Sequence, residues 1–164
     1  MVSAFSSERP GMPSGYGIST DAEGFVPWAW VEEQLTAARS YWVCTTRADG
    51  RPHAMPVWGL WLADRLLFST DPTSLKARNF AARPDVVVHL DSGDDVVVLE
   101  GRAEGMERDL VGRFCDAYDA KYSHRPEPDN EAHGLYQLVP ERVLAWREAD
   151  FPTSATRFRR TLSS

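Results

Sequence analysis

Short β-prone runs joined by tight turns occupy most of the sequence, with no regular alternation of strand and helix between them. The predicted strands cover residues 41–46, 51–61, 65–69, 86–90, 96–100, 135–139 and 142–147. Asp49-Gly50 supplies a hairpin turn after the first strand, Gly101 marks a bulge, and Pro140 interrupts the last strand pair. Helical spacing predicts helices only at residues 28–39, 72–83 and 107–122. This order excludes a doubly wound parallel sheet and favours a mainly β, α+β fold: an antiparallel barrel with two to three flanking helices.

The chain length and composition fit one domain. The chain has 164 residues, of which 43% are apolar and 26% charged, as in an ordinary globular protein. Residues 1–27 are rich in Gly and Pro and are predicted to form a flexible N-terminal segment. Residues 28–148 are predicted to form the barrel domain, and residues 149–164 a C-terminal tail.

The charge balance excludes several classes of function. Lys and Arg number 18 against 24 Asp and Glu, a net charge of −6, which argues against nucleic-acid binding. Cys44 and Cys115 lie in apolar segments without Cys-x-x-Cys spacing and are predicted to be small buried residues, and the four scattered histidines indicate no metal site. No signal peptide and no run of 18 apolar residues is found, so we expect a cytoplasmic protein with no membrane partner.

Residues 69–83 carry the clearest chemical signal. A strand ends at Ser69-Thr70, and a helix is predicted to follow with Asp71 as its N-cap and Pro72 at its first position. Between Pro72 and Pro84 the segment contains three cations and no acid, although the chain is acidic. A helix N-terminus with hydroxyls and cations is suited to bind an anion such as a phosphate; an ordinary solvated helix is the alternative.

The second predicted strand, residues 51–61, is unusual because Pro52 and Pro56 cannot donate to a sheet ladder. Proline confines such a strand to an edge or a bulge, which leaves part of its backbone free to meet a ligand. With period two, Met55 and Val57 share one face, while Pro56 and Trp58 share the other. A flat ring is able to lie against either face; a packed barrel strand is the alternative.

The order of these features resembles the pyridoxamine 5′-phosphate oxidase-like split barrel, also called the flavin/deazaflavin oxidoreductase superfamily. The matching pieces are residues 45–53, 55–59, 68–79, 84–90 and 98–103. The resemblance implies a homodimeric split β-barrel with FMN or the deazaflavin coenzyme F420 in a groove between the subunits, and a C-terminal tail placed to contact the partner. The implied cofactor-binding residues are Met55, Pro56, Val57, Trp58, Ser69, Thr70, Ser74, Lys76, Arg78 and Asn79.

The resemblance also implies residues at the ring or substrate face: Trp61, His89, Trp146 and Arg157. In the oxidases proper a C-terminal Trp is followed closely by Arg, whereas Trp146 and Arg157 are more widely separated, so pyridoxamine-phosphate oxidase activity itself is not predicted. The implied function is hydride transfer between the bound cofactor and a small organic substrate, with no catalytic side chain required because the cofactor performs the chemistry. The alternative is a non-catalytic protein that binds or sequesters a flavin, haem or tetrapyrrole.

Overall fold

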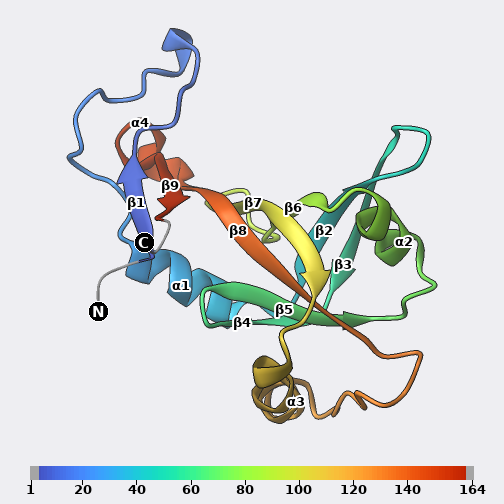
Figure 1. Cartoon of the computed structure of the whole chain (residues 1–164). Helices are drawn as coiled ribbons and strands as arrows, with labels where there is room; N and C mark the ends of the chain where they lie inside the picture. The colour runs from blue at the N-terminus through green and yellow to red at the C-terminus, as the bar shows by residue number, and fades with distance from the viewer. Residues whose placement is uncertain (1–3, 162–164) are drawn as a thin grey trace.

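The computed structural model describes residues 4–161, and its strands form one branched antiparallel sheet (Figure 1). The strands are β1 (Phe5–Glu8), β2 (Tyr41–Thr46), β3 (Pro52–Val57), β4 (Gly59–Leu62), β5 (Arg65–Thr70), β6 (Asp85–His89), β7 (Asp95–Gly105), β8 (Gly134–Arg147) and β9 (Thr156–Arg160). The helices are η1 (Ser14–Tyr16), α1 (Trp28–Ala37), α2 (Leu75–Ala82), α3 (Arg108–Tyr122), η2 (Glu148–Asp150) and α4 (Phe151–Ser154). The predicted α+β class and the long helices are confirmed.

The sheet branches at β8 and is open between β3 and β4. Its main path runs β1-β9-β8-β7-β6-β2-β3, while the first half of β8 pairs with β5, which pairs with β4. Of the consecutive strands β3 and β4, β3 therefore ends the main path and β4 ends the branch, and the two do not pair with each other. We call this opening the seam. Trp58 is the one residue between the two strands, so the chain crosses the seam there.

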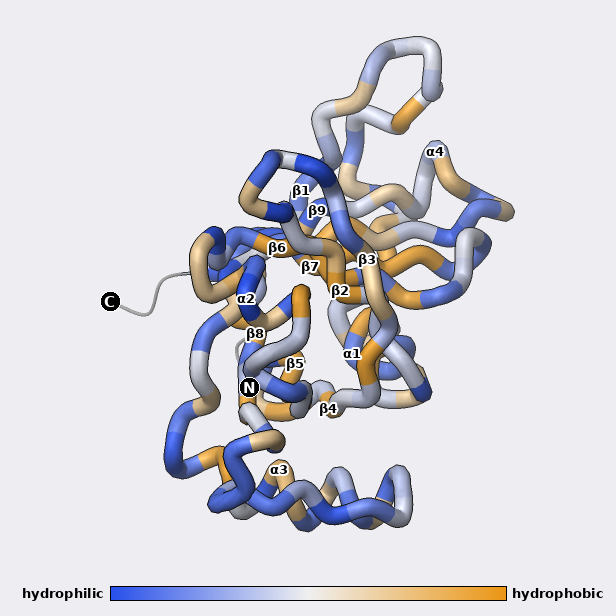
Figure 2. The backbone as a smooth tube through the Cα atoms, turned by 90° about the vertical axis from the view of Figure 1, so that its right-hand side faces the viewer, coloured by the Kyte–Doolittle hydropathy of each residue, from blue (hydrophilic) through white to orange (hydrophobic). Residues whose placement is uncertain are grey.

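Two apolar clusters lie on opposite sides of β5. Leu66 and Phe68 belong to the barrel interior, together with Tyr41, Val43, Leu99 and Leu138. Leu67 belongs to a second cluster between β4, β5 and the apolar face of α3. In Figure 2 the orange segments gather along β2, β6 and β7, while α3 alternates between blue and orange, as an amphipathic helix does. The alternation of β5 thus separates a barrel side from an α3 side.

Three local predictions are corrected. The predicted single strand over residues 51–61 is two strands, because Gly59 packs so close to β5 that a Cβ there would lie 2.8 Å from the Leu67 carbonyl oxygen. The predicted break at Pro140 does not occur: β8 runs through it, and the register shifts between Glu100 and Gly101, where a bulge was predicted, so that Glu141 next to Pro140 has no partner on β7.

The predicted start of the second helix is also wrong. α2 begins at Leu75 and its N-cap is Ser74, whose Oγ accepts a hydrogen bond from the Ala77 N–H at 3.4 Å. Asp71 instead closes a turn, because its Oδ1 accepts from the N–H and the hydroxyl of Thr73, each at 2.7 Å. Helix formation is thereby delayed by one turn relative to Pro72.

The two ends of the described chain pair with each other. β1 and β9 lie in the segments that were predicted as a flexible N-terminal segment and a C-terminal tail, and they form one end of the sheet. Arg9 holds the loop that follows β1, because its guanidinium donates to the carbonyls of Asp21, Glu23, Thr153 and Ala155. The sequence pattern missed β1 because a four-residue edge strand has too few residues to show a period. Residues 1–3 and 162–164 of those segments lie outside the described range. No helix within residues 4–161 is both long and apolar enough to cross a membrane.

Candidate functional site

Trp58 is presented at the seam by a packed junction rather than by a regular strand. Its side chain is 41% exposed, and its ring stacks on Tyr122 with centroids 4.7 Å apart and planes 3° apart. The Tyr122 hydroxyl accepts from the Gly59 N–H at 3.0 Å and lies within donating distance of the Gly59 and Arg39 carbonyls. Burial raises the pKa of Tyr122, so this hydroxyl keeps its proton. A large aromatic face is thus fixed at the opening between β3 and β4.

Along β3, side chains alternate between the barrel side and the outer side of the sheet. Met55 and Val57 lie opposite the buried Val43 and Tyr41, and Met55 remains 46% exposed because β3 ends the pairing path. Pro56 lies opposite Trp42 on the outer side. The stretch Met55–Trp58 therefore offers an exposed edge strand beside the seam, as the two prolines predicted.

Three basic side chains gather where β2 and β3 meet α2. Burial and the nearby positive charges of Arg47 and Lys76 lower the pKa of His53. Burial also lowers the pKa of Lys76, and the charge of Asp71 partly opposes this effect. Neither Lys76 nor Arg47 forms an ion pair within residues 4–161, and the buried Arg47 Nε has no hydrogen-bond partner there. The cluster therefore contains two cations, Arg47 and Lys76, that form no ion pair within the described chain, beside an imidazole whose lowered pKa favours its neutral form.

Buried hydrogen bonds hold this basic cluster in place. The Asn79 Nδ2 donates to the Thr45 Oγ1 at 2.9 Å, and Thr45 Oγ1 lies 3.3 Å from His53 Nδ1 and 3.4 Å from the His53 carbonyl oxygen. Asn79 and Thr45 are only 5% and 4% exposed. Asn79, predicted as a cofactor contact, thus uses its amide to position Thr45 and His53.

The last two residues of β5 face opposite sides of the sheet. Thr70 lies on the barrel side with Phe68, and its Oγ1 is 3.5 Å from the Ser74 Oγ at the start of α2. Ser69 lies on the α3 side with Leu67. Both border a cavity of about 330 Å³ that also reaches Trp58, Tyr118, His124 and His133. Arg78 is exposed on α2 and has no ion pair within the described residues.

The four predicted ring-face or substrate residues do not gather at the seam of one chain. Trp61 is half-buried against Trp28 at 6.2 Å, and its Nε1 is buried without a partner. His89 stacks on Trp42 at 6.3 Å on the outer side of the sheet. Trp146 lies against Phe151 at 5.6 Å, and Arg157 pairs with Glu8 at 2.8 Å. These four residues can act at the ring or substrate face only where a second chain brings them to the seam.

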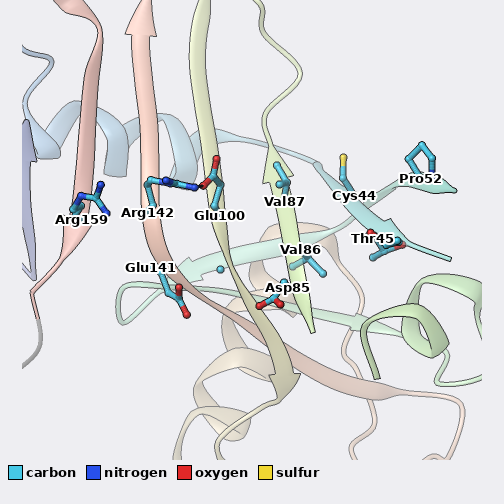
Figure 3. A pocket seen from close by; sticks show the side chains of 12 residues that line it. Cys44, Thr45, Pro52, Asp85, Val86, Val87, Glu100, Glu141, Arg142 and Arg159 are labelled. Carbon is cyan, nitrogen blue, oxygen red and sulfur yellow. Dashed lines mark hydrogen bonds and ion pairs between the residues drawn. The ribbon is translucent and has the colours of Figure 1, made fainter. Parts of the chain in front are cut away.

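A depression of about 630 Å³ lies on the outer side of the sheet, and neither Arg47, His53 nor Lys76 lines it. Figure 3 shows Arg159, Arg142, Glu100, Val87 and Cys44 in a row across five neighbouring strands, with Arg142 and Glu100 paired. Cys44 is only half-buried here, which corrects the prediction that both cysteines are buried; Cys115 is buried as predicted. The depression is a shallow polar surface on which few predicted site residues lie.

Sequence reasoning missed several residues that the fold brings to the site. Arg47 stands in a turn, where a lone cation carries no signal, and Thr45 reads as an ordinary strand residue. Tyr118 reads as helix core, and His124 and His133 belong to a polar loop. No group of His, Cys, Asp or Glu within residues 4–161 is arranged to hold a metal ion.

With its sheet branched at β8 and open at the seam, this α+β structure is a split barrel. The model of the pyridoxamine 5′-phosphate oxidase family matches residues 29–147, and the chain belongs to this family. The predicted family and fold are therefore confirmed. No curated protein matches the chain in sequence.

Several solved structures share the fold. An F420 reductase superposes with a TM-score of 0.57 at 23% identity, covering 68% of this chain and 94% of the other. A conserved hypothetical protein from Mycobacterium tuberculosis superposes with a TM-score of 0.65 at 21% identity, covering 79% and 90%. A haem-binding protein from Mycobacterium smegmatis gives 0.58 at 22% identity, covering 73% and 54%. At these identities the likeness concerns the fold alone.

Proposed function

We propose that this protein is an oxidoreductase that holds FMN or coenzyme F420 at the seam, with the cofactor phosphate at the cluster of Arg47, His53 and Lys76. The observation that carries the proposal is that Arg47 and Lys76, two cations without an ion pair in the described chain, lie beside His53 in a chain of net charge −6. A protein gains nothing in stability by crowding three basic groups together, whereas a bound dianion would relieve their repulsion.

The residues present fit a phosphate group with a planar ring attached. Ser74 and Thr70 add hydroxyls at the start of α2, whose free N–H groups favour an anion. Met55 and Trp58 supply exposed apolar surface against which a planar ring can rest. When bound, the cofactor would supply hydride transfer, while the protein supplies binding and positioning.

The second subunit predicted from the resemblance remains part of this proposal. In one chain the groove along β3 is open on one side, and Trp146 and Arg157 lie on other surfaces. A homodimer would close the groove and would bring residues of one chain toward the cofactor of the other. We assign no side chain a proton-transfer role.

Equilibrium titration of the purified protein with FMN and with F420 tests the proposal. We expect Lys76→Ala to weaken binding of the cofactor at least tenfold, because it removes one charge-assisted contact with a phosphate. Arg113→Ala is the matched control: Arg113 is an exposed cation on α3 without an ion pair in the described chain, so its loss should leave affinity unchanged. If neither cofactor binds the wild-type protein, or if both variants bind alike, the proposal is wrong.

Catalysis is distinguished from simple binding by a second measurement. The bound cofactor is reduced, and its reoxidation by an added organic acceptor is compared with that of free cofactor. Faster reoxidation on the protein supports an oxidoreductase. Reoxidation slower than in free solution supports a sequestering protein, the alternative for which the haem-binding structure provides a precedent of fold only.

A further inference from the structure

The cavity beside Ser69 and Thr70 adjoins the proposed cofactor site and shares Trp58 and Thr70 with it, while its other walls come from the end of α3 and the loop that follows. Its volume is about 330 Å³, within the range of small-molecule sites. It is lined by Trp58, Ser69, Thr70, Asp71, Tyr118, His124, Pro126, Ala132 and His133. Lys76 and Arg47, which carry the proposed phosphate site, do not line it.

Aromatic rings form a continuous wall of this cavity. Trp58 stacks on Tyr122 at 4.7 Å, and Tyr122 packs on Tyr118 at 4.6 Å. The chain of rings continues to His124, 6.4 Å from Tyr118, and then to His133, 6.2 Å from His124. Such a wall favours a planar aromatic ligand over an aliphatic one of equal size.

The loop over residues 123–133 is held by its own hydrogen bonds, so the imidazoles are positioned before a ligand arrives. The Glu127 N–H donates to His133 Nδ1 at 3.0 Å, and the His133 N–H donates to the Asn130 carbonyl at 2.8 Å. Arg125 ties the loop to α3 through Asp116 at 2.7 Å. Because Nδ1 accepts, a neutral His133 carries its proton on Nε2, which has no partner within residues 4–161.

The polar groups of the lining favour an uncharged ligand that both donates and accepts. Asp71 is the one acidic side chain of the lining, and Lys and Arg are absent from it. Its Oδ1 accepts from Thr73, while its Oδ2 has no hydrogen bond in the described chain. A ligand N–H would find this carboxylate, and a ligand carbonyl would find the His133 Nε2–H or the hydroxyls of Ser69 and Thr70. An anion would face Asp71 with no Lys or Arg in the lining.

We propose that this aromatic and imidazole-lined cavity binds an uncharged planar aromatic or heteroaromatic amide, with the ring beside Trp58 and the amide between Asp71 and His133. The cavity lies next to the seam, so the ligand would sit beside a bound cofactor; this placement rests on the proposed function. The binding itself does not depend on the cofactor.

NMR spectra of the four imidazole rings, recorded on the cofactor-free protein, test the proposal with benzamide as the probe. We expect benzamide to shift the signals of His124 and His133 saturably and to leave those of His53 and His89 in place. Cyclohexanecarboxamide, which has the same amide on a non-planar ring, should bind about fivefold more weakly. Equal shifts with both amides, or no shift at His124 and His133, would overturn the proposal.

Variants separate this site from the cofactor site. His133→Ala should weaken benzamide binding, while His89→Ala, which removes an imidazole on the outer side of the sheet, should bind as the wild type does. Unchanged His53 and His89 signals in His133→Ala would show that the fold is retained. If that variant binds benzamide as tightly as the wild type does, His133 does not line the benzamide site. Asp71→Asn provides a second variant if His133→Ala unfolds. Lys76→Ala should keep benzamide binding even where it loses the cofactor, so the two proposals can fail independently.

Discussion

Tyr122 joins three parts of the chain through one hydroxyl group. It accepts from the Gly59 N–H and lies near the carbonyls of Gly59 and Arg39, so it links α3, the start of β4 and the chain after α1. Lys121 reinforces the same junction, because its Nζ donates to the carbonyls of Ala38 at 2.6 Å and Gly59 at 3.2 Å. The orientation of Trp58 therefore depends on side chains that are far from it in sequence.

Removing the Tyr122 hydroxyl should loosen this junction. Tyr122→Phe leaves the buried Gly59 N–H without an acceptor, and we expect the free energy of unfolding to fall by about 1–3 kcal/mol. Urea unfolding measures the change, and Tyr16→Phe is the control, since Tyr16 is 58% exposed. Equal unfolding midpoints for the two variants would show that the hydroxyl does not stabilise the junction.

At the residue scale, the sequence indicated a charged segment of the site but not the contacts between residues that are distant in the chain. The acid-free segment indicated Lys76, which the structure places in the basic cluster. The same segment suggested Asn79 as a ligand contact, but its amide is used internally on Thr45. Arg47 and His133 gave no signal, because each becomes part of a site only through strand pairing or loop hydrogen bonds that join distant residues.

At the element scale, the bulge between β7 and β8 leaves Glu141 of β8 without a partner and brings Pro140 opposite Gly101. A Cβ on Gly101 would lie 2.2 Å from the Val139 carbonyl oxygen and 2.8 Å from the Pro140 Cα. We expect Gly101→Ala to lower the free energy of unfolding by about 2–4 kcal/mol, because backbone atoms must move. Gly112→Ala on α3 meets open space and should raise it by about 0.5–1 kcal/mol. Urea unfolding of both variants checks the pair, and a Gly101→Ala protein as stable as the wild type contradicts the bulge.

The β1–β9 pair depends on one carboxylate that faces two guanidinium groups. Hydrogen bonds from Arg159 and Arg157 lower the pKa of Glu8 below its usual value of 4.5. A lowered pKa in the folded state means that the stabilisation is complete above about pH 5.5 and is lost as the pH falls through 4.5 toward the folded-state pKa. We therefore expect the protection factors of residues 5–8, which compare amide hydrogen exchange with its intrinsic rate at each pH, to fall on acidification in this range.

Glu8→Gln is the control for this pH dependence. The amide keeps the shape of the side chain but does not titrate, so the protection factors in β1 should be lower than in the wild type at neutral pH and should not fall further below pH 4.5. An unchanged pH profile in the variant would show that another carboxylate is responsible.

The order of elements was largely predictable, because hydrophobic period and turn residues are local signals. The hairpin at Asp49-Gly50 and the helices α1 and α3 follow them directly. The break at Trp58 was not predictable, since it arises from the close packing of Gly59 on β5. The predicted start of α2 was wrong because Asp71 and Ser74 are both good N-cap residues. The Asp71 carboxylate accepts hydrogen bonds within a turn, so Ser74 caps the helix instead.

At the scale of the whole molecule, the outer side of the sheet is the surface on which we expect a protein partner to pack. The pairing register places Trp42, His89, Val98, Leu144 and Arg157 in one cross-strand row, and all five are half-buried. A neighbouring row carries Cys44 and Val87 before it ends in the Glu100–Arg142 pair (Figure 3). A sheet face with an apolar stripe and a charged margin is suited to a protein partner.

Leu144→Glu tests whether that partner is a second copy. If the predicted homodimer packs through this face, a carboxylate at 144 would be buried beside Arg157, whose guanidinium is already paired with Glu8, and the protein should become monomeric in light scattering at micromolar concentration. The variant should also lose cofactor affinity, because the proposed groove is completed by the second chain. Tyr16→Glu changes an exposed ring away from this row and should remain dimeric. A monomeric wild type excludes the interface site; a dimeric Leu144→Glu protein that keeps its cofactor places the contact on another surface.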